Sequence, residues 1–289
     1  MQWEGREESR NVDDRRGRGR AGLAIGGVGG LIIVVLGLIF NVDIQKFLGQ
    51  GGPGGDQQGP ADPQEEKLAH FAKVVFGDTE RVWEKQFRQM NPPREYKKPT
   101  LVLFSRHVDT DGCGSADAGV GPFYCPGDSS VYIDLSFYRV LEEKLGSPGE
   151  FARAYVLAHE VGHHVQRLLG YSARVEEAQR TASKAHANEM SVRLELQADF
   201  LAGVWAHHAE KQFKFLEKGD LESATHAAFN IGDDKLQMEA TGRVRKESFT
   251  HGSSAQRQAW FLEGFRTGDV KEARLLFELP YTNLMPPRR

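Results

Sequence analysis

Cysteine is scarce in this sequence, and neither sign of charge dominates it. Two of the 289 residues are cysteine, which is too few for a zinc ribbon. The formal net charge is −3 and the sequence pI is about 6.4, whereas proteins that bind nucleic acids usually carry a basic excess. We therefore expect no nucleic-acid partner, and any bound metal must be held by histidine and carboxylate side chains.

Charge is also missing from one long stretch of the chain. Residues 21–40 contain no charged side chain and are rich in glycine, isoleucine, leucine and valine, which is typical of a membrane-spanning helix. Arginines cluster just before this stretch, so the positive-inside rule predicts a cytoplasmic N-terminus and an extracytoplasmic domain after the span. A cleaved signal peptide is the alternative, but no cleavage site of small residues is clear.

The segments around this stretch differ in composition. Residues 1–20 mix arginine with acidic residues and predict a disordered cytoplasmic tail. Residues 41–64 have the Gly- and Pro-rich composition of a linker, which leaves residues 65–289 as the globular domain. A stripe of small residues in the apolar stretch would allow two helices to pack closely and suggests a possible homodimer. The stripe consists of Gly22, Gly26 and Gly30.

The two cysteines, Cys113 and Cys125, are close in sequence and lie in the compartment that the predicted topology makes non-reducing. We therefore predict a disulfide, with two free thiols as the alternative. An aspartate- and glycine-rich loop from Asp109 to Asp117 overlaps this region. Such a loop can bind calcium, but in the absence of a complete EF-hand loop a turn is the commoner outcome.

Hydrophobic periodicity predicts an α+β domain that is mostly helical, with a small β-sheet. Helical spacing is found in residues 65–90, 148–169 and 189–209, and short apolar runs that predict strands are found in residues 100–105, 121–125 and 130–134. Val131–Asp134 lies just ahead of the second helix and could be an edge strand that aligns an extended peptide.

The second of these helices carries the motif His-Glu-x-x-His. On a helix His159 and His163 project from one face, because positions i and i+4 are about 40° apart, and Glu160 lies beside them. Two imidazoles on one face are typical of a zinc site, and the adjacent glutamate is placed to act as general base on a zinc-bound water. We therefore predict His159 and His163 as zinc ligands and Glu160 as the catalytic base.

A catalytic zinc site usually needs a third protein ligand. The metzincin pattern would require glycine at position 166 and histidine at position 169, but the chain has Gln166 and Leu169 there. The remaining candidate is Glu195-x-x-x-Asp199, whose two acids share the buried face of the third helix. Buried like charges need a cation, and zinc held by Glu195 would supply it, with Asp199 accepting a hydrogen bond from a liganding histidine. Pairing of both acids with Arg193 or Arg153 is the alternative.

Several segments together resemble the neutral zinc metallopeptidase family of bacteria: the apolar N-terminal stretch, Gly121–Pro126, Val131–Asp134, His159–His164, Glu195–Asp199 and His251–Arg257. The resemblance covers nearly all of the chain after the linker and implies a zincin-like fold with a zinc cofactor. The Glu195-x-x-x-Asp199 element resembles the gluzincin arrangement, which implies Glu195 as third ligand and Asp199 as its partner. His251 could donate to the oxyanion of the reaction, although a surface histidine is the commoner outcome.

These observations predict a membrane-anchored zinc metalloendopeptidase of the bacterial inner membrane, with a single membrane pass, that hydrolyses peptide bonds outside the cytoplasm. The alternative is a catalytically silent zinc-binding ectodomain that binds a partner protein.

Overall fold

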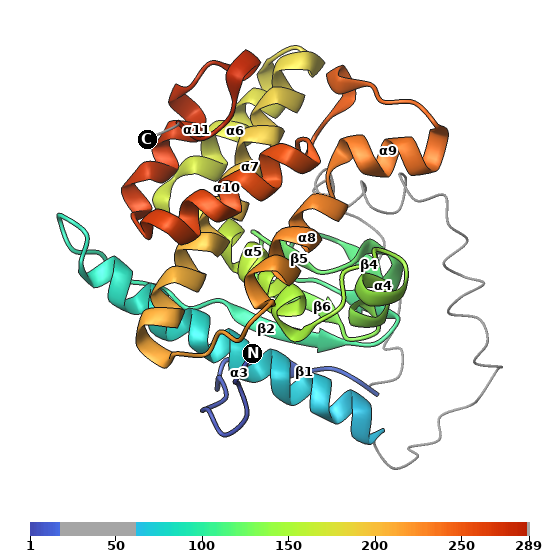
Figure 1. Cartoon of the computed structure of the whole chain (residues 1–289), viewed down its shortest axis with the longest axis vertical. Coiled ribbons are helices and arrows are strands. Elements are labelled where there is room, and N and C mark those ends of the chain that lie inside the picture. Colours follow the sequence, from blue (N-terminus) through green and yellow to red (C-terminus); the bar gives the residue numbers. More distant parts are fainter. Residues whose placement is uncertain (18–61, 288–289) are drawn as a thin grey trace.

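The computed structural model describes residues 1–17 and 62–287, in which helices pack against a small sheet (Figure 1). The strands are β1 (Val12–Asp14), β2 (Thr100–Phe104), β3 (His107–Asp109), β4 (Ser115–Asp117), β5 (Phe123–Cys125) and β6 (Ser130–Asp134). The α-helices are α3 (Pro63–Arg88), α4 (Phe137–Glu143), α5 (Glu150–Leu169), α6 (Tyr171–Thr181), α7 (Lys184–Phe213), α8 (Asp220–Asn230), α9 (Asp233–Thr241), α10 (Ser254–Thr267) and α11 (Leu275–Glu278). The three predicted helices correspond to α3, α5 and α7, and the three predicted strands to β2, β5 and β6.

The main sheet has the strand order β1-β2-β6-β5. The first three strands are parallel and β5 runs antiparallel to β6. Side chains alternate between the two faces of a strand, so Val131 and Ile133 join the large core that the helices form, while Tyr132 faces a smaller core with Val108 and Cys113. Since β6 lies between β2 and β5, the prediction that residues 131–134 form an edge strand is wrong. The strands at the two edges of this sheet are β1 and β5.

The disulfide prediction is confirmed. Cys113 and Cys125 are bonded, with their Cα atoms 5.9 Å apart. The aspartate-rich loop folds as the β3–β4 hairpin, in which the Ser115 hydroxyl donates to Asp109 and His107 contacts Asp117. The bridge therefore fastens this hairpin to β5, a strand at the edge of the main sheet.

Residues 1–17 are part of the folded body, so the prediction of a disordered tail is wrong for them. Trp3 is buried against α3, where its ring contacts Phe71. Its indole N–H donates to Glu150, the first residue of α5. Further along, β1 pairs with β2 in parallel. Disorder was predicted because the segment contains few apolar residues. The contacts of Trp3 and the pairing of β1 with β2 are nevertheless enough to hold it in place.

The membrane topology must be corrected as well. The predicted span over residues 21–40, with its glycine stripe, lies outside the described residues, as does most of the predicted linker. Among residues 1–17 and 62–287, none of the helices has both the length and the apolar character that a bilayer crossing needs. In addition, a single crossing would separate β1 from β2, yet the two strands pair. Neither the transmembrane helix of the predicted fold class nor the single-pass inner-membrane location is therefore supported.

Two close helix crossings determine the centre of the molecule. A Cβ atom on Gly162 of α5 would lie 3.0 Å from the carbonyl oxygen of Ala198 on α7. A Cβ atom on Gly264 of α10 would lie 2.0 Å from the carbonyl oxygen of Phe200, also on α7. Because only glycine leaves room for such backbone approach, α7 packs tightly against both neighbours. The side chains of α5, α7 and α10 therefore meet at one place.

Candidate metal centre

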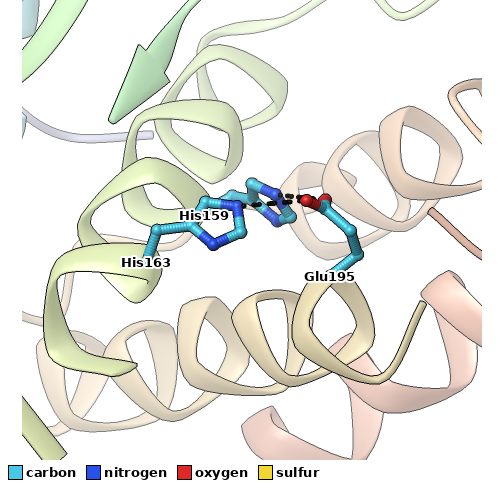
Figure 2. A group of neighbouring side chains, drawn as sticks. All are labelled: His159, His163 and Glu195. Carbon is cyan, nitrogen blue, oxygen red and sulfur yellow. Dashed lines mark hydrogen bonds and ion pairs between the residues drawn. The ribbon is translucent and has the colours of Figure 1, made fainter. Parts of the chain in front are cut away.

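His159, His163 and Glu195 come together where α5 crosses α7 (Figure 2). Each offers one ligand atom, and these atoms lie within 4.8 Å of one another. Nε2 of His159 is 3.2 Å from one oxygen of Glu195, and Nε2 of His163 is 3.5 Å from the other. The arrangement could hold a metal ion, and its donors are the three side chains that the sequence singled out.

Both imidazoles are oriented by their far nitrogen atoms. Nδ1 of His159 is 2.8 Å from Asp199, and Nδ1 of His163 is 2.9 Å from the side-chain oxygen of Gln166. The Gln166 amide in turn donates to the carbonyl of Leu194, which directs its oxygen at His163. With each Nδ1 serving as donor, each Nε2 faces Glu195, which is the arrangement that metal-binding histidines need.

The charges in this group are strongly coupled because the side chains are buried. Burial alone would lower the pKa of His159, but Asp199 and Glu195 raise it to about 10. Burial lowers the pKa of His163 to about 4, although the negative charge of Glu195 opposes this decrease. Burial would raise the pKa of Glu195, yet the surrounding histidines hold it well below its usual value. Glu195 is therefore an ionised carboxylate that faces one cationic and one neutral imidazole.

Glu160 lies beside this group and is 9% exposed. Burial raises the pKa of its carboxyl to about 7, with Glu195 adding to the rise and His159 opposing it. The carboxylate accepts a hydrogen bond from the backbone N–H of Tyr124 in β5. A base with a pKa near neutrality is suited to taking and returning a proton.

Asp199 lies behind His159 and is surrounded by donors. Its Oδ1 accepts from the Tyr155 hydroxyl at 2.5 Å, from His159 Nδ1 at 2.8 Å and from Arg257 Nη2 at 3.0 Å. Its Oδ2 accepts from Arg257 Nε at 2.8 Å. Burial alone would raise the pKa of Asp199, but Arg257 and His159 hold it below its usual value. The carboxylate is therefore ionised and its two oxygens act only as acceptors.

The sequence analysis assigned no role at the site to Tyr155, Gln166 or Arg257. Tyr155 precedes His159 by four positions, so the helical period that found His163 would also have placed it on this face. Arg257 ends the segment His251–Arg257 that carries part of the family resemblance, but nothing in the sequence links it to Asp199, because it comes from α10, 58 positions later. The arginines considered as alternative partners contact other groups: Arg193 pairs with Glu189 and Arg153 with Glu142.

The remaining motif histidines have separate roles. His164 is buried and contacts the carbonyl of Lys97 and the hydroxyl of Tyr124, so it packs α5 against β5. His251 precedes α10, and Asp233 accepts both its backbone N–H, at 2.6 Å, and its Nδ1, at 3.2 Å. Burial alone would lower the pKa of His251, but Glu195 and Asp233 raise it. The negative charge of Glu195 thus acts on the imidazole of His251 as well.

The comparisons with known proteins agree with this geometry. The model of the family described as "Putative neutral zinc metallopeptidase" matches residues 1–274. The chain belongs to this family. The resemblance seen in the sequence is thereby confirmed, and zinc is the metal that the family and the donor group share.

Two relatives show how far the similarity extends. The chain is similar to "Uncharacterized protein YpfJ" of Escherichia coli strain K12, with 46% identity over 93% of this chain and 96% of the relative. It is similar to "Uncharacterized protein Rv2575" of Mycobacterium tuberculosis strain H37Rv, with 47% identity over 60% of this chain and 61% of the relative. No solved structure matches the chain.

The donor set fits zinc on its own chemistry. Two imidazole nitrogens and one carboxylate oxygen are a ligand set that catalytic zinc sites use, and they leave a further position open. The hydrogen bonds on the far nitrogens and the ionised Glu195 agree with that assignment.

Proposed function

We propose that the chain is a zinc-dependent peptidase in which His159, His163 and Glu195 hold the metal and Glu160 is the general base. The single observation that carries the proposal is the geometry of these four side chains. Three ligand atoms lie within 4.8 Å of one another, and a carboxyl with a pKa of about 7 lies beside them. When bound, zinc lowers the pKa of a coordinated water and polarises the scissile carbonyl.

Glu160 carries the proton through the reaction. Its carboxylate accepts a proton from the attacking water while the water oxygen bonds to the carbonyl carbon of the peptide. The same group then gives the proton to the leaving nitrogen as the carbon–nitrogen bond breaks. The second proton of the water stays on the new carboxyl group until it passes to the new amine, so the products are a carboxylate and an ammonium group, and Glu160 returns to its ionised form.

His251 and β5 complete the proposed site. A protonated His251, fixed by Asp233, can donate to the oxyanion that develops at the scissile carbonyl. The hydrogen bond from the Tyr124 backbone N–H to Glu160 puts the outer edge of β5 next to the base. An extended peptide can therefore align along β5 by main-chain pairing.

The proposal is tested with the full chain, loaded with zinc, on an unbiased mixture of peptides. Mass spectrometry identifies the new termini, and the Glu160→Gln variant is the control because its amide cannot accept the proton. We expect wild-type chain to release products and Glu160→Gln to be slower by about 100- to 10,000-fold at equal zinc content.

Two outcomes would contradict the proposal. Equal product from both proteins would exclude Glu160 as the base. No product from either protein, in spite of bound zinc, would favour a zinc-binding domain without peptidase activity.

A further inference from the structure

The segment that begins at His251 carries a second group to the site. A capping box formed by Ser253 and Gln256 starts α10 immediately after His251. This fixed helix start places Arg257 in the first turn of α10, where it is 3% exposed. Gly264, two turns further on, packs against the backbone of α7 at Phe200. Arg257 is thus held directly against Asp199, the residue before Phe200.

Within residues 1–17 and 62–287, Arg257 is the side chain that donates to Oδ2 of Asp199. Tyr155 and His159 both use Oδ1 of the carboxylate, whereas Oδ2 is contacted by Arg257 Nε. The planar guanidinium contacts both oxygens at once and therefore sets the plane of the carboxylate. Nη1 also donates to the carbonyl of Ile231, which holds the guanidinium from its other side.

We propose that Arg257 is a positioning residue for the metal centre: it holds both oxygens of Asp199, and Asp199 then orients His159 with its Nε2 toward Glu195. Nη2 of Arg257 comes within 3.5 Å of Nδ1 of His159, but both atoms are donors and the contact is long, so Arg257 acts through Asp199. Without Arg257, Oδ2 would be a buried charge with no donor, and the carboxylate would be free to turn away from His159.

A matched control is available in the same helix pair. Arg193 lies two positions before Glu195 and is also buried, but it donates to the carbonyl oxygens of Leu276 and Leu279 and to Glu189. Its loss should damage the packing of the C-terminal segment and leave His159 untouched. Arg193→Met and Arg257→Met therefore remove the same side chain from two sites of similar burial.

The experiment measures zinc affinity in the full chain by competition with a chromophoric chelator at pH 7.5, together with the melting temperature of the metal-free proteins. Both methionine variants should melt at lower temperature than wild type. Arg257→Met should bind zinc about 10- to 100-fold more weakly, as expected for loss of a group that orients a ligand. Arg193→Met should keep the wild-type affinity within about threefold.

Two further variants separate positioning from general damage. Arg257→Lys keeps the charge but cannot contact both oxygens, so its zinc affinity should lie between those of the wild type and Arg257→Met. This variant replaces Arg257→Met in the comparison if the methionine variant does not fold. In an Asp199→Asn background, Arg257→Met should weaken zinc binding by less than about threefold, because both changes act on the same contact.

Either of two results would overturn the inference. One is equal zinc affinity for Arg257→Met and Arg193→Met. The other is a full, multiplicative loss in the Asp199→Asn/Arg257→Met double variant. Because the readout is zinc affinity, the result does not depend on whether the chain cleaves peptides.

Discussion

Two carboxylates one turn apart on α7 have opposite surroundings. Asp199 is enclosed by donors from α5 and α10, among them the permanent cation of Arg257. Glu195 faces His159 and His163 through atoms that can also bind a metal. Both acids are buried, and both keep a pKa below the usual value.

The difference shows how one buried helix face can serve two purposes. The charge of Asp199 is neutralised by protein, so this residue can stay in place whether or not metal is bound. Among the described residues, the direct contacts of the Glu195 carboxylate are with the imidazoles of His159 and His163, one of which is neutral, and the charge of Arg257 acts on it without a contact. A metal cation would therefore improve the surroundings of Glu195. We infer that metal binding depends mainly on Glu195 and metal-free stability mainly on Asp199.

Removal of the Glu195 charge should give the largest effect. Glu195→Gln loses a proposed ligand, and its zinc affinity should fall by more than about 100-fold, which exceeds the loss expected for a group that only orients a ligand. Chelator competition measures the affinity. A change smaller than that of Asp199→Asn would contradict the assignment of Glu195 as the ligand.

Removal of the Asp199 charge should affect stability most. Asp199→Asn leaves Arg257 as a buried cation with no anionic partner, so the free energy of unfolding of the metal-free protein should fall by about 3–5 kcal/mol. Urea unfolding monitored by circular dichroism checks this value, with Glu195→Gln as the comparison. If Glu195→Gln destabilised the metal-free protein more than Asp199→Asn, the contrast between the two acids would be wrong.

The pH dependence of zinc binding should follow His159. Its pKa of about 10 means that zinc must displace a proton at lower pH, so the affinity should rise about tenfold per pH unit from pH 7.5 to 9. Above neutral pH, Glu160, with a pKa of about 7, is already ionised, so it should contribute little to the change of zinc affinity with pH. Titration calorimetry in buffers of different ionisation enthalpy counts the released protons. Release of no proton would contradict a cationic His159.

The smallest effect is expected at Tyr155. Tyr155→Phe removes one of the donors to Oδ1 but leaves Arg257 and His159 in contact with Asp199. The free energy of unfolding should fall by about 1 kcal/mol. Zinc affinity, measured by the same competition assay, should stay within about threefold of wild type. A loss as large as that of Arg257→Met would mean that Tyr155 positions Asp199 as strongly as Arg257 does.

The site was more predictable than its surroundings. The helical period alone brought His159 and His163 to one face, and the same period paired Glu195 with Asp199. Sequence reasoning assigned one cation, zinc, to both acids, whereas Arg257 neutralises Asp199. That partner depends on how α10 packs against α7, and packing between distant segments leaves no periodic signal in the sequence.

The N-terminal segment shows where composition fails. Residues 1–17 contain few apolar residues, and the rule that links a shortage of apolar residues to disorder predicted a tail. Trp3 nevertheless fills a site beside Phe71, and Arg6 pairs with the buried Asp78 while its guanidinium stacks over Phe213. Average composition cannot detect anchors of this kind, because each is a single residue that matches one particular site.

The most direct test of the proposed metal centre is a crystal structure of the zinc-loaded chain with an anomalous difference map at the zinc edge. We predict one peak at about 2.0–2.2 Å from Nε2 of His159, Nε2 of His163 and a carboxylate oxygen of Glu195. Asp199 should still be bound to Arg257. A zinc ion bound by Asp199, or one held away from these histidines, would contradict the account.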